Sequence, residues 1–271
     1  MPGWRNWDAY HALHFCLSKL KFIPVSETSA ARTGRLRTYC STIFTRFPPI
    51  DMPPPPPGDD PPPGPYSLDS YLNGVTTDVT VRHLSGSGWN VAAKTTTGGF
   101  GAWVDDVQAL NDRQLPMSEV LAIDQRDLAL RVANIGFGAG RAVPIAEELV
   151  RLLDTRPPAR VARAREVADV ASAAEHDRTI RTVDQLARLG GITPRTLQRM
   201  FVSCAGVSPT WVIRRFRLIE AAERVRDGQS TDWAALAVDL GYADQAHLTR
   251  DFTATLGMSP GAYAAGNRDR P

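Results

Sequence analysis

The sequence has no long hydrophobic run. No stretch approaches the roughly 18 uninterrupted apolar residues that a membrane-spanning helix needs. Residues 1–16 mix tryptophan, arginine, aspartate and histidine where a signal peptide would carry a continuous apolar segment. The hydrophobic fraction of 43% and charged fraction of 22% are typical of soluble globular proteins. We therefore expect a cytoplasmic protein with no membrane partner.

Cysteine is scarce and scattered. Cys16, Cys40 and Cys204 form no CxxC pair and no Cys/His spacing that would build a zinc site or a disulfide framework. The sequence also lacks a nucleophile elbow, a P-loop, an HExxH motif and a dinucleotide-binding fingerprint. We expect no metal, no cofactor and no enzymatic activity, and we expect Cys204 to be a packing residue.

Proline is concentrated in residues 47–65, which include uninterrupted proline runs at 53–57 and 61–63. Each proline lacks a backbone N–H and fixes φ, so this segment excludes a helix or a central strand and favours a polyproline II linker. Residues 1–46 show no sustained hydrophobic period. The sequence predicts that residues 1–65 are a poorly ordered extension that ends in a disordered proline-rich segment.

A small α+β domain is predicted over residues 66–155. Two segments of β-branched or alternating residues, 79–82 and 89–92, flank a turn-prone Ser-Gly-Ser-Gly stretch and predict short strands. Short helices are predicted after them, over residues 102–110, 128–132 and 143–153. Pro157 and Pro158 disfavour helical backbone at Arg156 and mark a boundary, after which a second domain is predicted over residues 160–266.

The second domain contains an internal repeat, and a repeat decides an architecture more firmly than any single propensity. Four matching segments recur in the same order, at residues 186–187 and 236–237, 191–192 and 241–242, 197–201 and 248–252, and 206–209 and 257–260. The repeat predicts two copies of one structural unit.

The first copy, which we call motif one, has the local chemistry of a helix-turn-helix. Thr182 and Gln185 form a capping-box pattern at the start of a helix. Gly190 and Gly191 supply backbone freedom for a tight turn, and Thr193 then caps a second helix with proline at its first position.

The second copy, motif two, is predicted to start at Ser230 or Thr231, to turn at Gly241 and to cap its second helix at Asp244. Between the motifs, a helix is predicted from Pro209 to about Asp227, and at ~1.5 Å per residue it spans roughly 27 Å. Major grooves on one face of B-DNA recur about every 34 Å. The second helix of motif one and the second helix of motif two could therefore enter successive grooves of the DNA without dimerisation of the protein.

The outer faces of these second helices carry side chains that read base edges. In motif one, helical spacing places Leu197 and Phe201 inward, so that a basic and polar face is left outward. Arginine pairs with guanine, glutamine with adenine, and threonine with either. The candidate base-reading residues are Arg195, Gln198 and Arg199 in motif one and Gln245, His247, Thr249 and Arg250 in motif two; Arg214 and Arg215 are candidate phosphate contacts.

The two motifs differ in charge. Around motif one, eight arginines are opposed mainly by three acidic residues, whereas four aspartates in motif two dilute Arg250. We therefore expect motif one to supply most of the DNA affinity. An exposed arginine is usually only solvated, but Arg199 and Arg250 occupy equivalent places in both copies, which favours contact with DNA. The aromatic residues Trp211, Phe216, Trp233 and Tyr263 are expected to be core anchors.

Residues 193–201, 206–209, 232–237, 240–242, 244–252 and 257–260 together resemble the AraC/XylS family of bacterial transcription regulators. The resemblance implies a seven-helix, monomeric DNA-binding domain with base contacts at Arg195, Gln198 and Arg199 and at Gln245, His247 and Arg250. The block at 66–155 is similar to the sensor or dimerisation domains of this family in its position and element order only. The expected partners are double-stranded DNA, a small-molecule effector and RNA polymerase.

Two alternatives belong to other functional classes. A repair protein of the Ada type has a similar DNA-binding part, but it needs a zinc-bound thiolate cluster, and three scattered cysteines do not provide one. A protein-interaction module is the other alternative, with Asp239 and Asp251 of motif two binding RNA polymerase and only weak DNA contact. A sequence-specific transcription regulator is the favoured interpretation.

Overall fold

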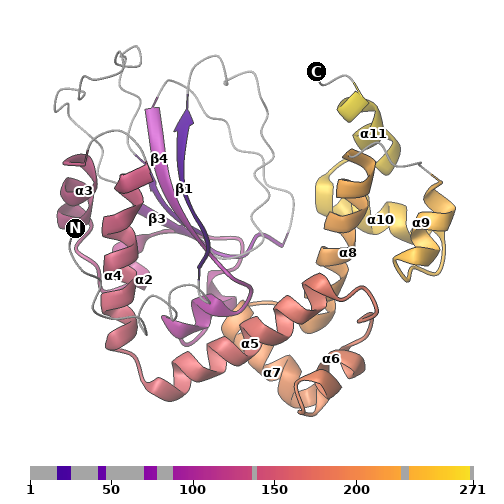
Figure 1. Cartoon of the computed structure of the whole chain (residues 1–271), viewed down its shortest axis with the longest axis horizontal. Helices are drawn as coiled ribbons and strands as arrows, with labels where there is room; N and C mark the ends of the chain where they lie inside the picture. Colours follow the sequence, from indigo (N-terminus) through magenta and orange to yellow (C-terminus); the bar gives the residue numbers. More distant parts are fainter. Residues whose placement is uncertain are drawn as a thin grey trace. The chain divides into compact units, whose positions relative to one another are not determined.

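A computed structural model describes six parts of the chain, namely residues 17–25, 42–46, 70–77, 88–135, 139–226 and 232–268. The chain divides into two compact units (Figure 1). The first unit comprises residues 1–76, 80–168 and 202–206, and the second comprises residues 77–79, 169–201 and 207–271. No helix in the described parts is long and apolar enough to cross a membrane.

An antiparallel five-stranded sheet lies in the first unit. Its strands are β1 (Leu17–Val25), β2 (Thr42–Arg46), β3 (Ser70–Asn73), β4 (Gly88–Thr95) and β5 (Gln114–Pro116), in the order β1-β4-β2-β3-β5. β1 and β2 precede the proline-rich segment, in the region expected to be a poorly ordered extension, so the sheet combines strands from both sides of that segment. The strand expected at residues 89–92 lies within β4, and the one expected at 79–82 lies outside the described residues.

The helical elements of the first unit surround its hydrophobic core. They are η2 (Gly99–Ala102), η3 (Gln108–Leu110), α2 (Met117–Val120), α3 (Gln125–Ala133), η4 (Ala139–Ala142) and α4 (Val143–Asp154). α3 and α4 confirm the helices expected at residues 128–132 and 143–153. The buried residues include Phe100, Trp103, Leu128, Ile145 and Leu149.

The helix expected over residues 102–110 was wrong. That segment instead holds the end of η2 and the short η3. Phe100 to Trp103 are buried without interruption, and Trp103 Nε1 donates a hydrogen bond to the Leu149 carbonyl at 3.0 Å. Continuous burial of this kind suits the tightly wound turn of η2 inside the core, and exposed residues recur only after it, at 105, 106, 108 and 109.

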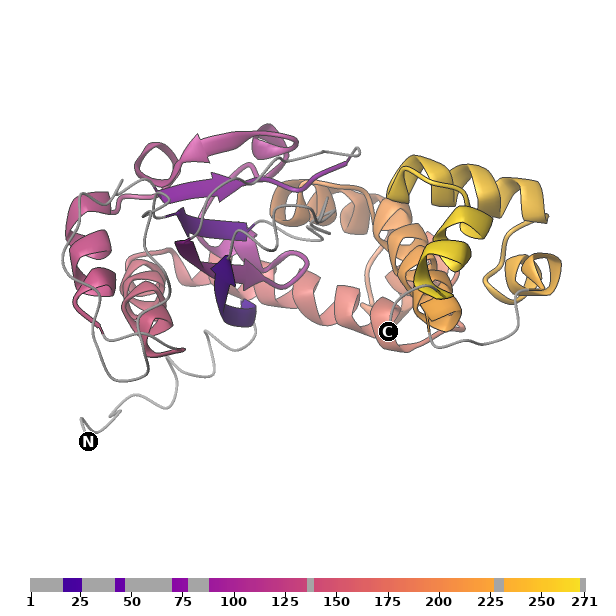
Figure 2. The same ribbon diagram turned by 90° about the horizontal axis from the view of Figure 1, so that it is seen from above.

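α5 (Pro158–His176) begins directly after Pro157, which confirms that the helical backbone is interrupted at Arg156. The remaining helices are α6 (Val183–Leu189), α7 (Pro194–Ala205), α8 (Pro209–Arg226), α9 (Trp233–Asp239), α10 (Gln245–Leu256) and α11 (Pro260–Arg268). From residue 158 onward, the described chain therefore has the seven helices that the family resemblance implies. Figure 2 shows these helices from a second side.

Within the second unit, α8, α9 and α10 pack around one apolar cluster. Leu218 of α8, Leu236 of α9 and Phe252 of α10 are buried together. Trp233 and Tyr263 pack against the cluster, and each contacts the Phe252 ring edge-on, with centroids 6.2 and 5.6 Å apart. These contacts confirm both aromatic residues as core anchors.

Candidate nucleic-acid interface

Motif one is formed by α6, a glycine turn and α7. The Gln185 backbone N–H donates to Thr182 Oγ1 at 3.2 Å, and the Thr182 N–H donates to Gln185 Oε1 at 3.0 Å. This reciprocal pair confirms the capping box. Gly191 has a φ of +64°, which favours glycine in the turn, and Thr193 Oγ1 accepts from the Thr196 N–H at 3.2 Å as α7 begins.

α7 separates a buried face from an exposed one. Leu197 and Phe201 are 1% and 0% exposed, and they anchor the helix in the core. The structure brings the three predicted side chains to the opposite face, where all are exposed: Arg195, Gln198 and Arg199. Among the described residues, none of these three side chains has a hydrogen bond or an ion pair, so they are free to contact a ligand.

Motif two repeats this geometry with different caps. Asp232 is the N-cap of α9, and one of its carboxylate oxygens accepts from the Ala234 and Ala235 N–H groups at 3.0 Å. The start expected at Ser230 or Thr231 is therefore corrected by one or two residues, because the aspartate carboxylate caps the helix instead. Gly241 has a φ of +80°.

The second helix of motif two begins as expected. Asp244 is the N-cap of α10, and its carboxylate accepts from the His247 N–H at 2.6 Å. Leu248 and Phe252 of α10 are fully buried, and Gln245 and Arg250 are exposed. Gln245 and Arg250 are thus available at the surface, as predicted.

The other two candidates of α10 are half-buried. The His247 ring meets the Tyr242 ring edge-on at 5.1 Å, and His247 Nε2 lies 4.0 Å from an Asp251 carboxylate oxygen. Thr249 is also partly covered, and its carbonyl accepts from the Thr253 hydroxyl at 2.8 Å. Motif two therefore presents fewer fully exposed polar side chains than were predicted from helical spacing.

The acidic residues of motif two have local partners. Asp232 and Asp244 cap helices, and Asp239 forms an ion pair with Arg224 at 2.5 Å. Most of the negative charge that the sequence assigns to this motif is therefore involved in holding its own backbone and α8 in place.

Some arginines near motif one also have internal roles. Arg217 is 3% exposed, and its Nη2 donates to the Asp177 and Ile180 carbonyls at 2.9 and 2.8 Å. Its Nη1 lies 3.4 Å from a carboxylate oxygen of Glu220. Arg217 therefore supports α8 and is not available to DNA.

Glu220 is the centre of an ion-pair network on α8. Its Oε1 lies 2.8 Å from Arg178 Nε and 2.7 Å from Arg224 Nη2. Through Arg224 the network reaches Asp239 at the end of α9. Arg181, just before motif one, adds a second link by donating to the Asp239 carbonyl at 2.8 Å. The network fixes both motifs to the same connecting helix.

The two predicted phosphate contacts differ. Arg214 is exposed and has no hydrogen bond or ion pair among the described residues. Arg215 is half-buried, with its guanidinium carbon 5.4 Å from the centroid of the Trp211 ring. The geometry therefore favours Arg214 over Arg215 as a contact for DNA.

Cys204, near the end of α7, is buried at 5% exposure, and burial raises the pKa of its thiol. Gly101 lies against it so closely that a Cβ there would come within 2.6 Å of the Cys204 Cα. Both residues belong to the first unit. These contacts confirm that Cys204 is a packing residue.

The profile of a family described as a helix-turn-helix domain matches residues 186–266. AraC-like transcription regulators from Streptomyces antibioticus and Streptomyces lividans are each 34% identical over 82 residues, which is 30% of this chain. The match spans only 27% of the length of these relatives. Among solved structures, ToxT from Vibrio cholerae aligns with a TM-score of 0.43 and 12% identity, covering 91% of this chain and 97% of ToxT.

Proposed function

Residues 186–266 form a helix-turn-helix domain of the AraC type, and from this premise we propose that the chain is a sequence-specific transcription regulator that acts on double-stranded DNA in the cytoplasm. In this proposal, α7 and α10 each place their exposed face in a major groove. The observation that carries the proposal is the pair of exposed arginines at matching positions, Arg199 and Arg250, neither of which has an ion-pair partner in the described part of the chain.

The length of α8 supports reading of two successive grooves. Its 18 residues span about 27 Å at ~1.5 Å per residue, and grooves on one face of DNA recur about every 34 Å. Arg195, Gln198 and Arg199 are the proposed base contacts of α7, and Gln245, His247 and Arg250 those of α10. Thr249 is a weaker candidate because it is partly covered.

The first unit has a sheet and a buried core of its own, which suits a separate role in sensing or dimerisation. We propose a small-molecule effector and RNA polymerase as further partners. One observation favours a protein contact at motif two: Val238 of α9 is 65% exposed, at the position that matches the exposed Arg188 of motif one. A protein-interaction role for α9 is the second candidate function.

The test is selection of binding sites from a random DNA pool by the full chain. We expect an enriched sequence with two conserved blocks about one helical turn apart. The double variant Arg195→Ala/Arg199→Ala changes only exposed side chains and is compared with the wild type. It should lose the conserved block read by α7 and keep the other block. If no sequence is enriched, or if the double variant enriches the same two blocks, the proposal is wrong.

A further inference from the structure

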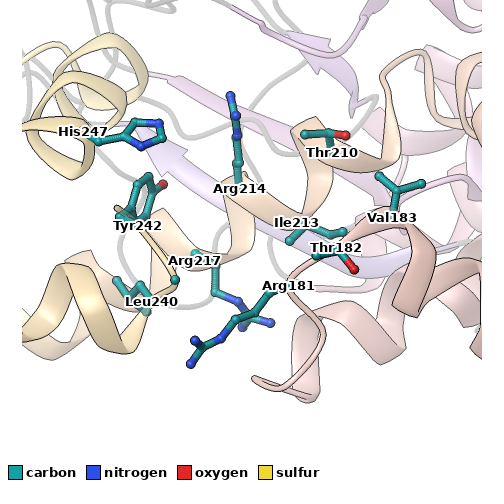
Figure 3. A pocket seen from close by; sticks show the side chains of 11 residues that line it. Arg181, Thr182, Val183, Thr210, Ile213, Arg214, Arg217, Leu240, Tyr242 and His247 are labelled. Carbon is teal, nitrogen blue, oxygen red and sulfur yellow. The ribbon is translucent and has the colours of Figure 1, made fainter. Parts of the chain in front are cut away.

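A pocket of about 310 Å³ lies within the second unit, between the two motifs. It is lined by one face of α8, by the start of motif one and by the turn and second helix of motif two. Its polar side chains are those of Arg181, Thr182, Thr210, Arg214, Arg217, Tyr242 and His247 (Figure 3). In Figure 3 Arg214 stands between Thr210 on one side and Tyr242 and His247 on the other.

The lining has a positive charge. It contains three arginines and no carboxylate. Arg181 donates to a carbonyl of α9, and Arg217 is held by carbonyls and Glu220. Arg214 has no such partner among the described residues. Its guanidinium is therefore available to pair with an anion in the pocket.

The pocket also contains polar atoms that are buried and unsatisfied. Tyr242 is 8% exposed and Arg217 is 3% exposed, yet Tyr242 Oη and Arg217 Nε form no hydrogen bond within the described residues. A buried polar atom without a partner is costly, so a group bound in the pocket that accepts from the Tyr242 hydroxyl would be stabilised.

The Tyr242 hydroxyl is a donor at every physiological pH. Burial raises the pKa of this phenol, and the nearby Asp251 carboxylate raises it further through its charge and a side-chain contact with the hydroxyl that is too loose to count as a hydrogen bond, while the charge of Arg214 acts in the opposite direction. Arg214 and Tyr242 line the same pocket, and their side chains are neighbours in Figure 3. A guanidinium and a protonated phenol thus lie together on the wall of one pocket.

We propose that this pocket binds a phosphate group attached to an organic moiety, with Arg214 pairing with its charge and the Tyr242 hydroxyl donating to a phosphate oxygen. The volume is at the lower end of the range for small-molecule sites, which is about 300–1,000 Å³, and it exceeds what bare phosphate needs. Ile213 and Leu240 provide an apolar wall for the attached moiety.

Two sources supply this chemistry. One is the DNA phosphodiester that passes between the grooves read by α7 and α10, and this source rests on the proposed function. The other is a free organic phosphate that occupies the pocket without DNA. Two experimental arms separate these sources.

The DNA arm uses the site enriched by selection, with a neutral methylphosphonate replacing one phosphate at a time between the two conserved blocks. We expect one central position at which neutralisation weakens binding about tenfold, as the loss of a charged hydrogen bond implies. Arg214→Ala should cause a similar loss on unmodified DNA and no further loss at that position. Arg188→Ala, which removes another exposed arginine of the same domain, should remain additive there.

The second arm titrates the full chain without DNA with glycerol 3-phosphate, with glycerol as the control, by calorimetry. Saturable binding that is lost in Arg214→Ala and weakened in Tyr242→Phe assigns the pocket to a free organic phosphate. The Tyr242→Phe variant keeps the buried ring, and circular dichroism checks that it folds.

Either positive arm supports the phosphate site. Additive losses at every DNA position together with no binding of glycerol 3-phosphate overturn it. If selection enriches no DNA, the proposed function fails, and the second arm still decides the pocket.

Discussion

Motif one and motif two have the same geometry and different surfaces. Both have a side-chain cap before the second helix and a positive-φ glycine in the turn, at Gly191 and Gly241. At two matching positions, however, the charge differs. Motif one has Arg188 and Arg195, and motif two has Val238 and Ala246 at these places. The backbone requirements of the fold are thus met twice, while the charge that attracts DNA is concentrated on one copy.

The motifs also share a single support. Arg217 and Glu220 of α8 bind groups that precede motif one, and the same network extends through Arg224 to the end of α9. Changes in this network should affect both motifs, whereas changes on the exposed faces should affect one.

Arg217→Met should weaken both motifs together, because it removes their shared support. The variant leaves the Asp177 and Ile180 carbonyls without their buried donor, and we expect a loss of about 3 kcal/mol in the free energy of unfolding. Urea denaturation measures it, and DNA binding by both blocks should fall together. Arg178→Ala is the control because the Arg178 side chain is 67% exposed, so its ion pair with Glu220 should contribute little. An unchanged urea midpoint for Arg217→Met would contradict the supporting role.

Alanine at the two turn glycines should separate the motifs. Either change places a Cβ at positive φ, which costs about 1 kcal/mol. At Gly191 a Cβ meets nothing within 4 Å, whereas at Gly241 it lies 3.0 Å from Arg181 Cδ. We expect Gly241→Ala to destabilise the chain more than Gly191→Ala in the same denaturation assay. Equal losses of unfolding free energy would show that the Arg181 side chain moves away from the added Cβ at no energetic cost.

Exchanging charge at the caps should shift affinity with little effect on folding. Asp244→Asn keeps a good N-cap and removes a negative charge beside α10, so DNA affinity should rise a few-fold. Thr193→Asp adds that charge to motif one and should lower affinity by a similar factor. Fluorescence anisotropy at two salt concentrations measures both. If both variants bind DNA as the wild type does, the aspartates do not limit motif two.

Much of the second unit could be predicted because its signals are local. Thr182 with Gln185, Pro194 and the turn glycines identify both motifs through capping and backbone freedom alone, and these positions were confirmed. The reading face of α7 also follows from helical spacing, since Leu197 and Phe201 are buried.

The remainder depends on contacts between distant residues. The sequence counted Arg217 and Arg178 as part of a basic surface, but their partners lie about 40 residues away, on segments that only the fold brings together. The pocket is likewise lined by segments that are distant in sequence. The partial burial of His247 has a local cause, because the turn before α10 brings the Tyr242 ring against it. In the first unit, the segment from 102 to 110 was predicted as a helix, and its contact with α4 through Trp103 could not be read from the sequence because α4 is distant along the chain.

The most direct test of the division between the motifs compares Arg199→Ala with Arg250→Ala on the selected DNA site and on versions of that site with single base changes. We expect Arg199→Ala to lose about 1–3 kcal/mol of binding free energy and to relax specificity in the block read by α7. Arg250→Ala should lose less, and only in the other block. A loss from Arg250→Ala that equals or exceeds that from Arg199→Ala would contradict the account, because motif one would then not be the stronger reader.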